Sequence, residues 1–180
     1  MRTIDHWTYA ERMMKDLKMS RAKKLAFQLG CVMPDFNKFS YMGHHLNDWA
    51  KGHSFKVRRR EIHTFFDRPC RDTVLWWFLA GLKVHYLGDS FSRPHNPEFG
   101  YDSDAHVNYE WKLHNHTHLV LKHRPYRPAK VSGSLAHWLS RRHERYMKLT
   151  RGVRDDAYFI DTTLMGFWEW MKKNVLHISM

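Results

Sequence analysis

Hydrophobic residues recur along this chain mainly at the three- and four-residue spacing of an α-helix, and alternating strand patterns are scarce. We expect Gly30 to end the second helix and Met33, Pro34 and Asp35 to form a turn. We expect a loop with a short helix over residues 36–55. The predicted helices cover about 3–19, 21–29, 56–66, 69–91, 103–123, 134–150 and 155–177. This pattern predicts an all-α fold, a compact multi-helix bundle in a single domain over 1–180.

The helix predicted over 69–91 differs from the others because its run VLWWFLAGLKVHYLG is apolar nearly all round. Such a helix is expected in the middle of a fold. The densest apolar window, Val74 to Leu82, is too short to cross a bilayer. The first residues carry no apolar signal segment. We therefore expect a cytoplasmic protein, or one that lies peripherally on a membrane.

The composition fits a folded globule with an affinity for anions. Of 180 residues, 43% are hydrophobic, which supports a real core. The formal charge of +12 favours contact with phosphates, nucleic acid or an anionic membrane surface. Cys31 and Cys70 have neither a disulfide framework nor metal-binding spacing, so we interpret both as reduced core residues.

The most informative stretch is HYLGDSFSRPHNPEFGYDSDAHVNYE, from His85 to Glu110. It contains two pairs spaced four residues apart, His85 with Asp89 and His106 with Glu110, and the Pro-flanked His95 between them. Residues four apart lie on the same face of a helix, so each pair can direct an imidazole and a carboxylate at one point. Zinc accepts this mixture of nitrogen and oxygen ligands.

Three further candidate ligands lie upstream, at His6, Asp35 and His53. His6 falls in the first predicted helix. Asp35 and His53 stand in short segments with Gly or Pro, which would hold a side chain in a fixed direction. Together with the His85–Glu110 stretch, these residues are candidate ligands for a metal site.

The block GLKVHYLGDSFSRPHNPEF followed by HVNYE resembles the zinc-dependent phospholipase C family, whose fold and signature the P1/S1-type nucleases largely share. The resemblance is strong over about 78–113 and weaker, but in the same order, over about 3–55. It implies the phospholipase C/P1 nuclease fold and two or three zinc ions. Phospholipases carry a glutamate at the position of Glu110, where the nucleases typically carry an aspartate, so Glu110 favours the phospholipases.

The resemblance also implies how the ligands are shared. His95, His106 and Glu110 would bind one zinc; Asp35, His53 and His85 a second; Asp89 would bridge the second to a third, which His6 would also bind. Asp35 matches the family's proposed general base. His44 and His45 are alternatives to His53. Family enzymes use a processed N-terminal amine on the third zinc, well before the histidine that matches His6. Here Met1 precedes His6 by five residues, and we expect a weaker, water-completed or absent third site.

The chemistry expected of such a centre is hydrolysis of a phosphate ester, because zinc ions bind the phosphate and activate a water. A phospholipid would be cleaved on the glycerol side of its phosphate. Phe36 and Phe55, near the predicted ligands, are candidate contacts for a choline-like headgroup. The alternatives are a nuclease on the same scaffold, which the positive charge would suit, and a zinc-binding protein without catalytic activity. The oligomeric state is not predicted.

Overall fold

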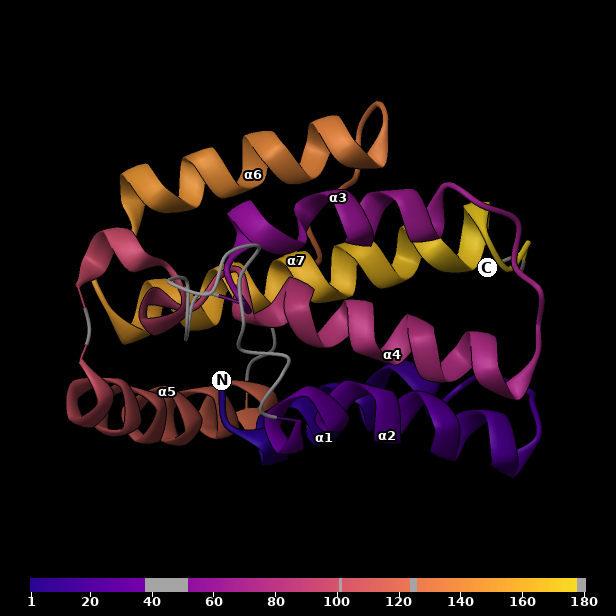
Figure 1. The fold of residues 1–180 in the computed structure, drawn as a ribbon, viewed down its shortest axis with the longest axis horizontal. Coiled ribbons are helices and arrows are strands. Elements are labelled where there is room, and N and C mark those ends of the chain that lie inside the picture. The colour runs from indigo at the N-terminus through magenta and orange to yellow at the C-terminus, as the bar shows by residue number, and fades with distance from the viewer. Residues whose placement is uncertain (38–51, 101, 124–125, 178–180) are drawn as a thin grey trace.

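A computed structural model describes residues 1–37, 52–100, 102–123 and 126–177 (Figure 1). Within these ranges the chain forms α-helices and two short 3₁₀ helices, with no strand, so the predicted all-α class is confirmed. The α-helices are α1 (Thr3–Met14), α2 (Arg21–Phe36), α3 (Phe55–Phe66), α4 (Val74–Asp89), α5 (Ser103–His123), α6 (Leu135–Leu149) and α7 (Val153–Asn174). The 3₁₀ helices are η3 (Arg93–His95) and η4 (Pro97–Phe99).

The helices pack around α4 and α7. Figure 1 shows α6 along the upper edge of the molecule and α1, α2 and α5 along the lower edge. Helix α4 contacts α2, α3 and α7, while α5 and α6 both contact α7. The buried position predicted for the apolar helix is confirmed: Trp77, Ala80 and Leu87 are at most 2% exposed. Val74 and Leu75, in the first turn of α4, are exposed, and Phe78, Leu79, Leu82 and Lys83 are half-buried.

Helix α2 corrects one sequence prediction, because it continues through Gly30 and Pro34 to Phe36. Gly30 does not end the helix; it is where α2 touches α4. A Cβ at Gly30 would lie 2.1 Å from the carbonyl oxygen of Phe78, and one at Gly81 would lie 2.2 Å from that of Phe27. The two glycines therefore allow backbone contact between the helices. The predicted turn over 33–35 is also wrong, and Asp35 lies in the last turn of α2.

The other helices agree with the sequence pattern apart from their ends. The first helix ends at Met14 rather than about Met19, and the central one begins at Val74, where the Thr73 hydroxyl accepts a hydrogen bond from the Trp76 amide. The predicted start at 103 and end at 123 of α5 are confirmed. No helix of the described part is long and apolar enough to cross a membrane. Both cysteines are free; Cys31 is buried and Cys70 is partly exposed.

Candidate metal centre

The C-terminal ends of α2 and α4 lie side by side and carry the centre of the site. The two helices run in the same direction, since Lys23 pairs with Asp72 near their starts and the Cys31 carbonyl contacts His85 near their ends. Asp35 lies in the last turn of α2, and Asp89 is the last residue of α4. A helix C-terminus carries partial negative charge, so carboxylates there are unfavourable unless a cation is close. The placement of both aspartates thus favours a cation at this point.

Eight predicted ligands come together here, and we call them the donor cluster: His6, Asp35, His53, His85, Asp89, His95, His106 and Glu110. They fall into three groups whose donor atoms lie within 4.8 Å of one another. The first is His6, Asp35, His85 and Asp89; the second is His53, Asp89 and His95; the third is His95, His106 and Glu110. The alternatives to His53, His44 and His45, lie outside the described residues, as does most of the predicted loop over 36–55.

Asp89 is the hub of the donor cluster: like His95 it belongs to two of these groups, and its two oxygens also contact three imidazoles. Its Oδ1 lies 3.1 Å from Nε2 of His6, and its Oδ2 lies 2.7 Å from Nδ1 of His53. The same Oδ2 lies 3.1 Å from Nε2 of His85, one helical turn earlier. The Asp89 side chain is fully buried. A buried carboxylate with three imidazoles around it can bridge two metal ions.

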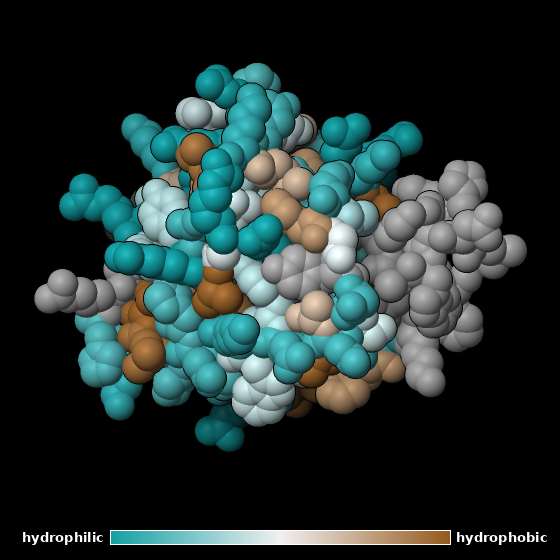
Figure 2. All heavy atoms as spheres, turned by 90° about the vertical axis from the view of Figure 1, so that its left-hand side faces the viewer, coloured by the Kyte–Doolittle hydropathy of each residue, from teal (hydrophilic) through white to brown (hydrophobic). Residues whose placement is uncertain are grey.

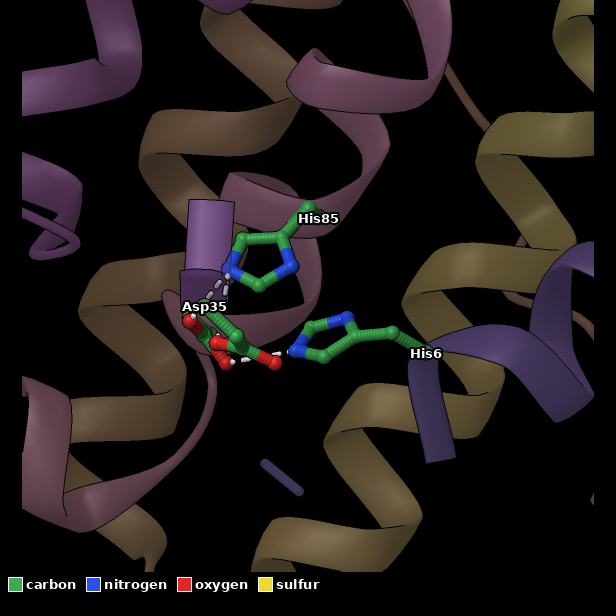
Figure 3. Close-up of side chains that lie close together, drawn as sticks. His6, Asp35 and His85 are labelled. Carbon is green, nitrogen blue, oxygen red and sulfur yellow. Dashed lines mark hydrogen bonds and ion pairs between the residues drawn. The ribbon is translucent and has the colours of Figure 1, made fainter. Parts of the chain in front are cut away.

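The first group joins three helices. Figure 3 shows His6 of α1 and His85 of α4 directing their rings toward Asp35 of α2. Nε2 of His85 lies 3.6 Å from Oδ1 of Asp35, and the rings of His6 and His85 stack with centroids 3.8 Å apart. The other oxygen of Asp35, Oδ2, accepts a hydrogen bond of 2.7 Å from the Thr3 hydroxyl.

The ring orientation of His85 provides a test of whether the site fits a metal. Its Nδ1 lies 2.8 Å from the carbonyl oxygen of Cys31, and a carbonyl only accepts, so Nδ1 carries the proton. In the neutral ring, Nε2 then directs a lone pair at carboxylate oxygens of Asp35 and Asp89. Lone pairs and carboxylates repel each other unless a cation lies between them. A backbone carbonyl behind a ligating histidine is the usual outer contact of metal sites, so the residues present fit a divalent metal.

The third group brings the two ends of the HNPEF…HVNYE segment together. Nε2 of His95, in η3, lies 3.1 Å from Oε1 of Glu110, and Nε2 of His106 lies 3.2 Å from the same oxygen. His95 also reaches Oδ1 of Asp89, at 3.5 Å, and so connects this group to the hub. The family resemblance implies the same three residues as the ligands of one zinc.

The grouping around His53 differs from the implied one. The resemblance places His53 with Asp35 and His85, and His6 with Asp89 alone. In the structure, His6 joins Asp35 and His85, while His53 lies with Asp89 and His95. Nδ1 of His53 is nevertheless only 3.3 Å from Nε2 of His85, so the two arrangements are close in space.

The amine of Met1 also lies in the donor cluster, although the short separation of Met1 from His6 led us to expect a weaker, water-completed or absent third site. It donates to Oδ1 of Asp89 at 2.8 Å and lies 3.0 Å from Oε1 of Glu110. Burial alone would lower the pKa of this amine, but Asp89 and Glu110 outweigh burial and raise the pKa to about 11. A positive charge is therefore already stabilised among these donors.

The protonation states suit metal binding, which requires ionised carboxylates and neutral imidazoles. Burial opposes ionisation of Asp89 and Glu110, but the surrounding histidines and the Met1 amine hold both pKa values below the usual range. Burial lowers the pKa of His6 and His95, and that of His53 to about 4. His85 is the exception: burial acts to lower its pKa, but the negative charge of Asp89, with smaller contributions from its other contacts, outweighs burial and raises the pKa.

A pocket of about 600 Å³ opens onto the donor cluster between α1, α2 and α5. Asp35, His106 and Glu110 line it together with Met1 and with five residues that the sequence did not single out as site residues: Arg2, Thr3, Ile4, Trp7 and Val32. Phe36, a predicted substrate contact, also lines this pocket and is 72% exposed. The pocket brings solvent and small ligands to the predicted ligands.

Phe55, the other predicted substrate contact, does not reach this pocket. It is 5% exposed and stacks on His143 of α6, with ring centroids 4.1 Å apart. It lines a separate cavity of about 960 Å³ between α3, η4 and α6. The donor cluster contributes no residue to that cavity.

The sequence patterns did not reveal the residues that hold the ligands in place. The Cys31 carbonyl has no sequence signal, because every residue has one. Asp156 of α7 is fully buried and accepts hydrogen bonds from the Arg93 amide and from the hydroxyls of Tyr109, Tyr146 and Thr150. It thereby ties the η3 segment, which carries His95, to α5, which carries Glu110. The sequence placed Asp156 only near the start of the last predicted helix and gave no signal of this role.

The fold and site define an all-α protein with a clustered histidine–carboxylate centre suited to several metal ions. A family model described as zinc dependent phospholipase C matches residues 5–152, and the chain belongs to this family. The match covers most of the chain and includes all eight residues of the donor cluster. Searches of curated proteins and of solved structures gave no match.

Proposed function

We propose that this chain is a zinc-dependent phospholipase C that hydrolyses a phospholipid between phosphorus and the glycerol oxygen. The observation that carries the proposal is the donor cluster itself: three adjoining groups of buried or half-buried ligands share Asp89 and His95, and Asp35, His106 and Glu110 line one pocket. Family membership supports zinc as the metal and a phospholipid-type substrate.

The three groups of donors would hold two or three zinc ions, with Asp89 shared between positions. Bound zinc supplies Lewis acidity: it polarises the phosphate oxygens, lowers the pKa of a bound water and stabilises the departing alkoxide. The protein's own contribution is to hold the ligands in the correct ring orientation, as the Cys31 carbonyl does for His85.

Asp35 is the residue we assign as the general base. It lies on the pocket wall, its side chain is 13% exposed, and Thr3 fixes one of its oxygens at 2.7 Å. The carboxylate would accept a proton from the attacking water as the water oxygen bonds to phosphorus. The bond from phosphorus to the glycerol oxygen breaks, and the released diacylglycerol alkoxide takes up a proton. The products are diacylglycerol and the phosphorylated headgroup.

The test is a product analysis on the metal-loaded protein with two substrates, phosphatidylcholine and single-stranded DNA. We expect diacylglycerol and phosphocholine from the lipid and no cleavage of DNA. Glu110→Ala should abolish lipid cleavage, because it removes a donor of the third group, whereas His118→Ala, on an exposed position of the same helix, should not. Cleavage of DNA but not of lipid, lost in Glu110→Ala, would instead assign a nuclease. Bound zinc with neither activity would assign a zinc-binding protein without catalysis.

A further inference from the structure

An exposed apolar stripe runs along α2 and ends at the pocket of the donor cluster. Leu25, Leu29, Met33 and Phe36 are 49%, 41%, 40% and 72% exposed. Their spacing of four, four and three residues places them on one face of the helix. This face lies opposite the buried residues Phe27, Gly30 and Pro34, which turn toward the core. A solvent-facing helix surface is normally polar, so this stripe requires an explanation.

The stripe continues around the mouth of the pocket on two other helices. Ile4 of α1 lines the pocket and is 49% exposed. On α5, Val107 and Trp111 follow His106 and Glu110 directly and are 56% and 49% exposed. Arg2, which lines the pocket, lies over the Trp111 ring at 3.4 Å. In Figure 2, brown and tan hydrophobic spheres lie at several places on a largely teal surface, including its lower right.

The charges around the stripe match an anionic lipid surface. Arg21 precedes Leu25 by one turn on the same face of α2, and Lys24 is its neighbour. Lys15 and Lys18, after α1, are exposed beside the start of α2. The whole chain has a formal charge of +12. Apolar side chains with Trp and with flanking Lys and Arg are the composition of surfaces that insert into the headgroup layer of a membrane.

We propose that the α2 stripe and the apolar rim of the pocket dock this protein on a lipid bilayer, with the mouth of the donor-cluster pocket facing the membrane. This proposal rests on the proposed phospholipase function for its biological purpose. Docking in this orientation brings a phospholipid headgroup to Asp35 and Glu110 without moving the lipid through water. The acyl chains stay against Phe36, Ile4 and the rest of the rim.

The test compares Leu25→Gln/Leu29→Gln with Leu149→Gln, because glutamine keeps helix propensity while removing apolar surface. Leu25 and Leu29 do not line the pocket, so the double variant leaves the donor cluster intact. Leu149 is equally exposed, at 49%, but belongs to α6, on the opposite edge of the molecule in Figure 1. Circular dichroism establishes that each variant is folded.

Two measurements are made on the metal-loaded proteins. The first is sedimentation with vesicles made of a phosphonate analogue of phosphatidylcholine and dicetyl phosphate. The proposed reaction does not cleave these lipids. The second is hydrolysis of dibutyroyl phosphatidylcholine, a lipid that dissolves as single molecules. We expect the double variant to bind vesicles at least about tenfold more weakly, since two inserted leucines are lost. Its hydrolysis of the soluble lipid should be unchanged, and Leu149→Gln should match the wild type in both.

Vesicle binding by the double variant equal to that of the wild type would overturn the proposal, as would an equal loss in Leu149→Gln. A wild-type dimer that the double variant dissociates, with no vesicle binding, would assign the stripe to a second copy of this chain and also overturn it. Vesicle binding that depends on Leu25 and Leu29, without hydrolysis of either lipid, would support docking and refute the proposed phospholipase activity.

Discussion

Gly30 and Gly81 bring α2 and α4 into backbone contact directly beneath the donor cluster. A methyl group at either position would lie about 2 Å from a backbone carbonyl oxygen of the other helix. Backbone atoms cannot rotate away as a side chain can, so the helices would have to separate. Asp35 and His85 lie one turn beyond this contact, and their distance from each other depends on it.

Gly81→Ala should therefore weaken both the fold and the site. We expect a loss of about 1 to 3 kcal/mol in the free energy of unfolding, the usual range for overpacking, measured by urea denaturation. Zinc affinity should fall as well. Gly152→Ala is the matched control, because nothing lies within 4 Å of its added methyl. Equal stability of the two variants would show that the helices are not in contact as described.

The amount of zinc bound per chain should distinguish the role of Asp89 from that of the third group. Asp89→Asn removes a donor shared by two groups, whereas His106→Gln removes one from the third group alone. We expect Asp89→Asn to lose more zinc per chain than His106→Gln, measured by atomic emission on dialysed protein. His118→Gln, an exposed residue of α5, should retain the wild-type content. An equal loss in Asp89→Asn and His106→Gln would contradict the hub role.

Asp156→Asn should lower zinc affinity although residue 156 contacts no member of the donor cluster in the described contacts. The carboxylate accepts four hydrogen bonds, and an amide can accept fewer while adding donors of its own. We expect a destabilisation of about 2 to 4 kcal/mol in unfolding, with a weaker zinc affinity measured by competition with a chelator. A variant that is destabilised but binds zinc as the wild type does would show that Asp156 does not position His95.

The stability of the fold should fall at mildly acidic pH partly because of His143. Burial lowers the pKa of His143 from 6.5 to about 4. The unfolded chain therefore binds this proton more readily, so the stabilisation is present above pH 6.5 and is lost as the pH falls toward 4. The loss is about 1 to 3 kcal/mol, allowing for the partial exposure of the ring.

His143→Gln removes this group while keeping a donor for the Asn96 side chain, which Nε2 of His143 contacts at 2.9 Å. Urea denaturation at several pH values between 4 and 7 gives the comparison. The wild type should lose more stability than the variant over this range, and parallel pH profiles would contradict the assignment.

The helical pattern and the ligand spacing were readable from the sequence because both are local. Four-residue spacing places His85 with Asp89 and His106 with Glu110 on single helices, and the structure has them there. The extension of α2 through Gly30 was not readable. A glycine that ends a helix and one that allows close packing look identical in a sequence, and only the partner, Gly81, distinguishes them.

Contacts between distant segments were beyond local patterns as well. The site joins the Cys31 carbonyl to His85 and Asp156 to the η3 segment, and neither pairing leaves a signal at fixed spacing. The apolar stripe on α2 was hidden for a related reason: α2 is apolar on two faces, and a sequence does not show which one lacks a partner. Phe55 seemed a substrate contact because of its position after His53, but it turns to His143 in another cavity.

The central claim is that zinc held by the donor cluster hydrolyses a phospholipid, and titration of metal-free protein with zinc tests it most directly. Diacylglycerol release from phosphatidylcholine is followed as zinc is added, with Asp89→Asn beside the wild type. The account predicts no activity in metal-free protein, a rise with zinc until the sites fill, and little activity at any zinc concentration in Asp89→Asn. Full diacylglycerol release by the metal-free protein, or by Asp89→Asn, would contradict it.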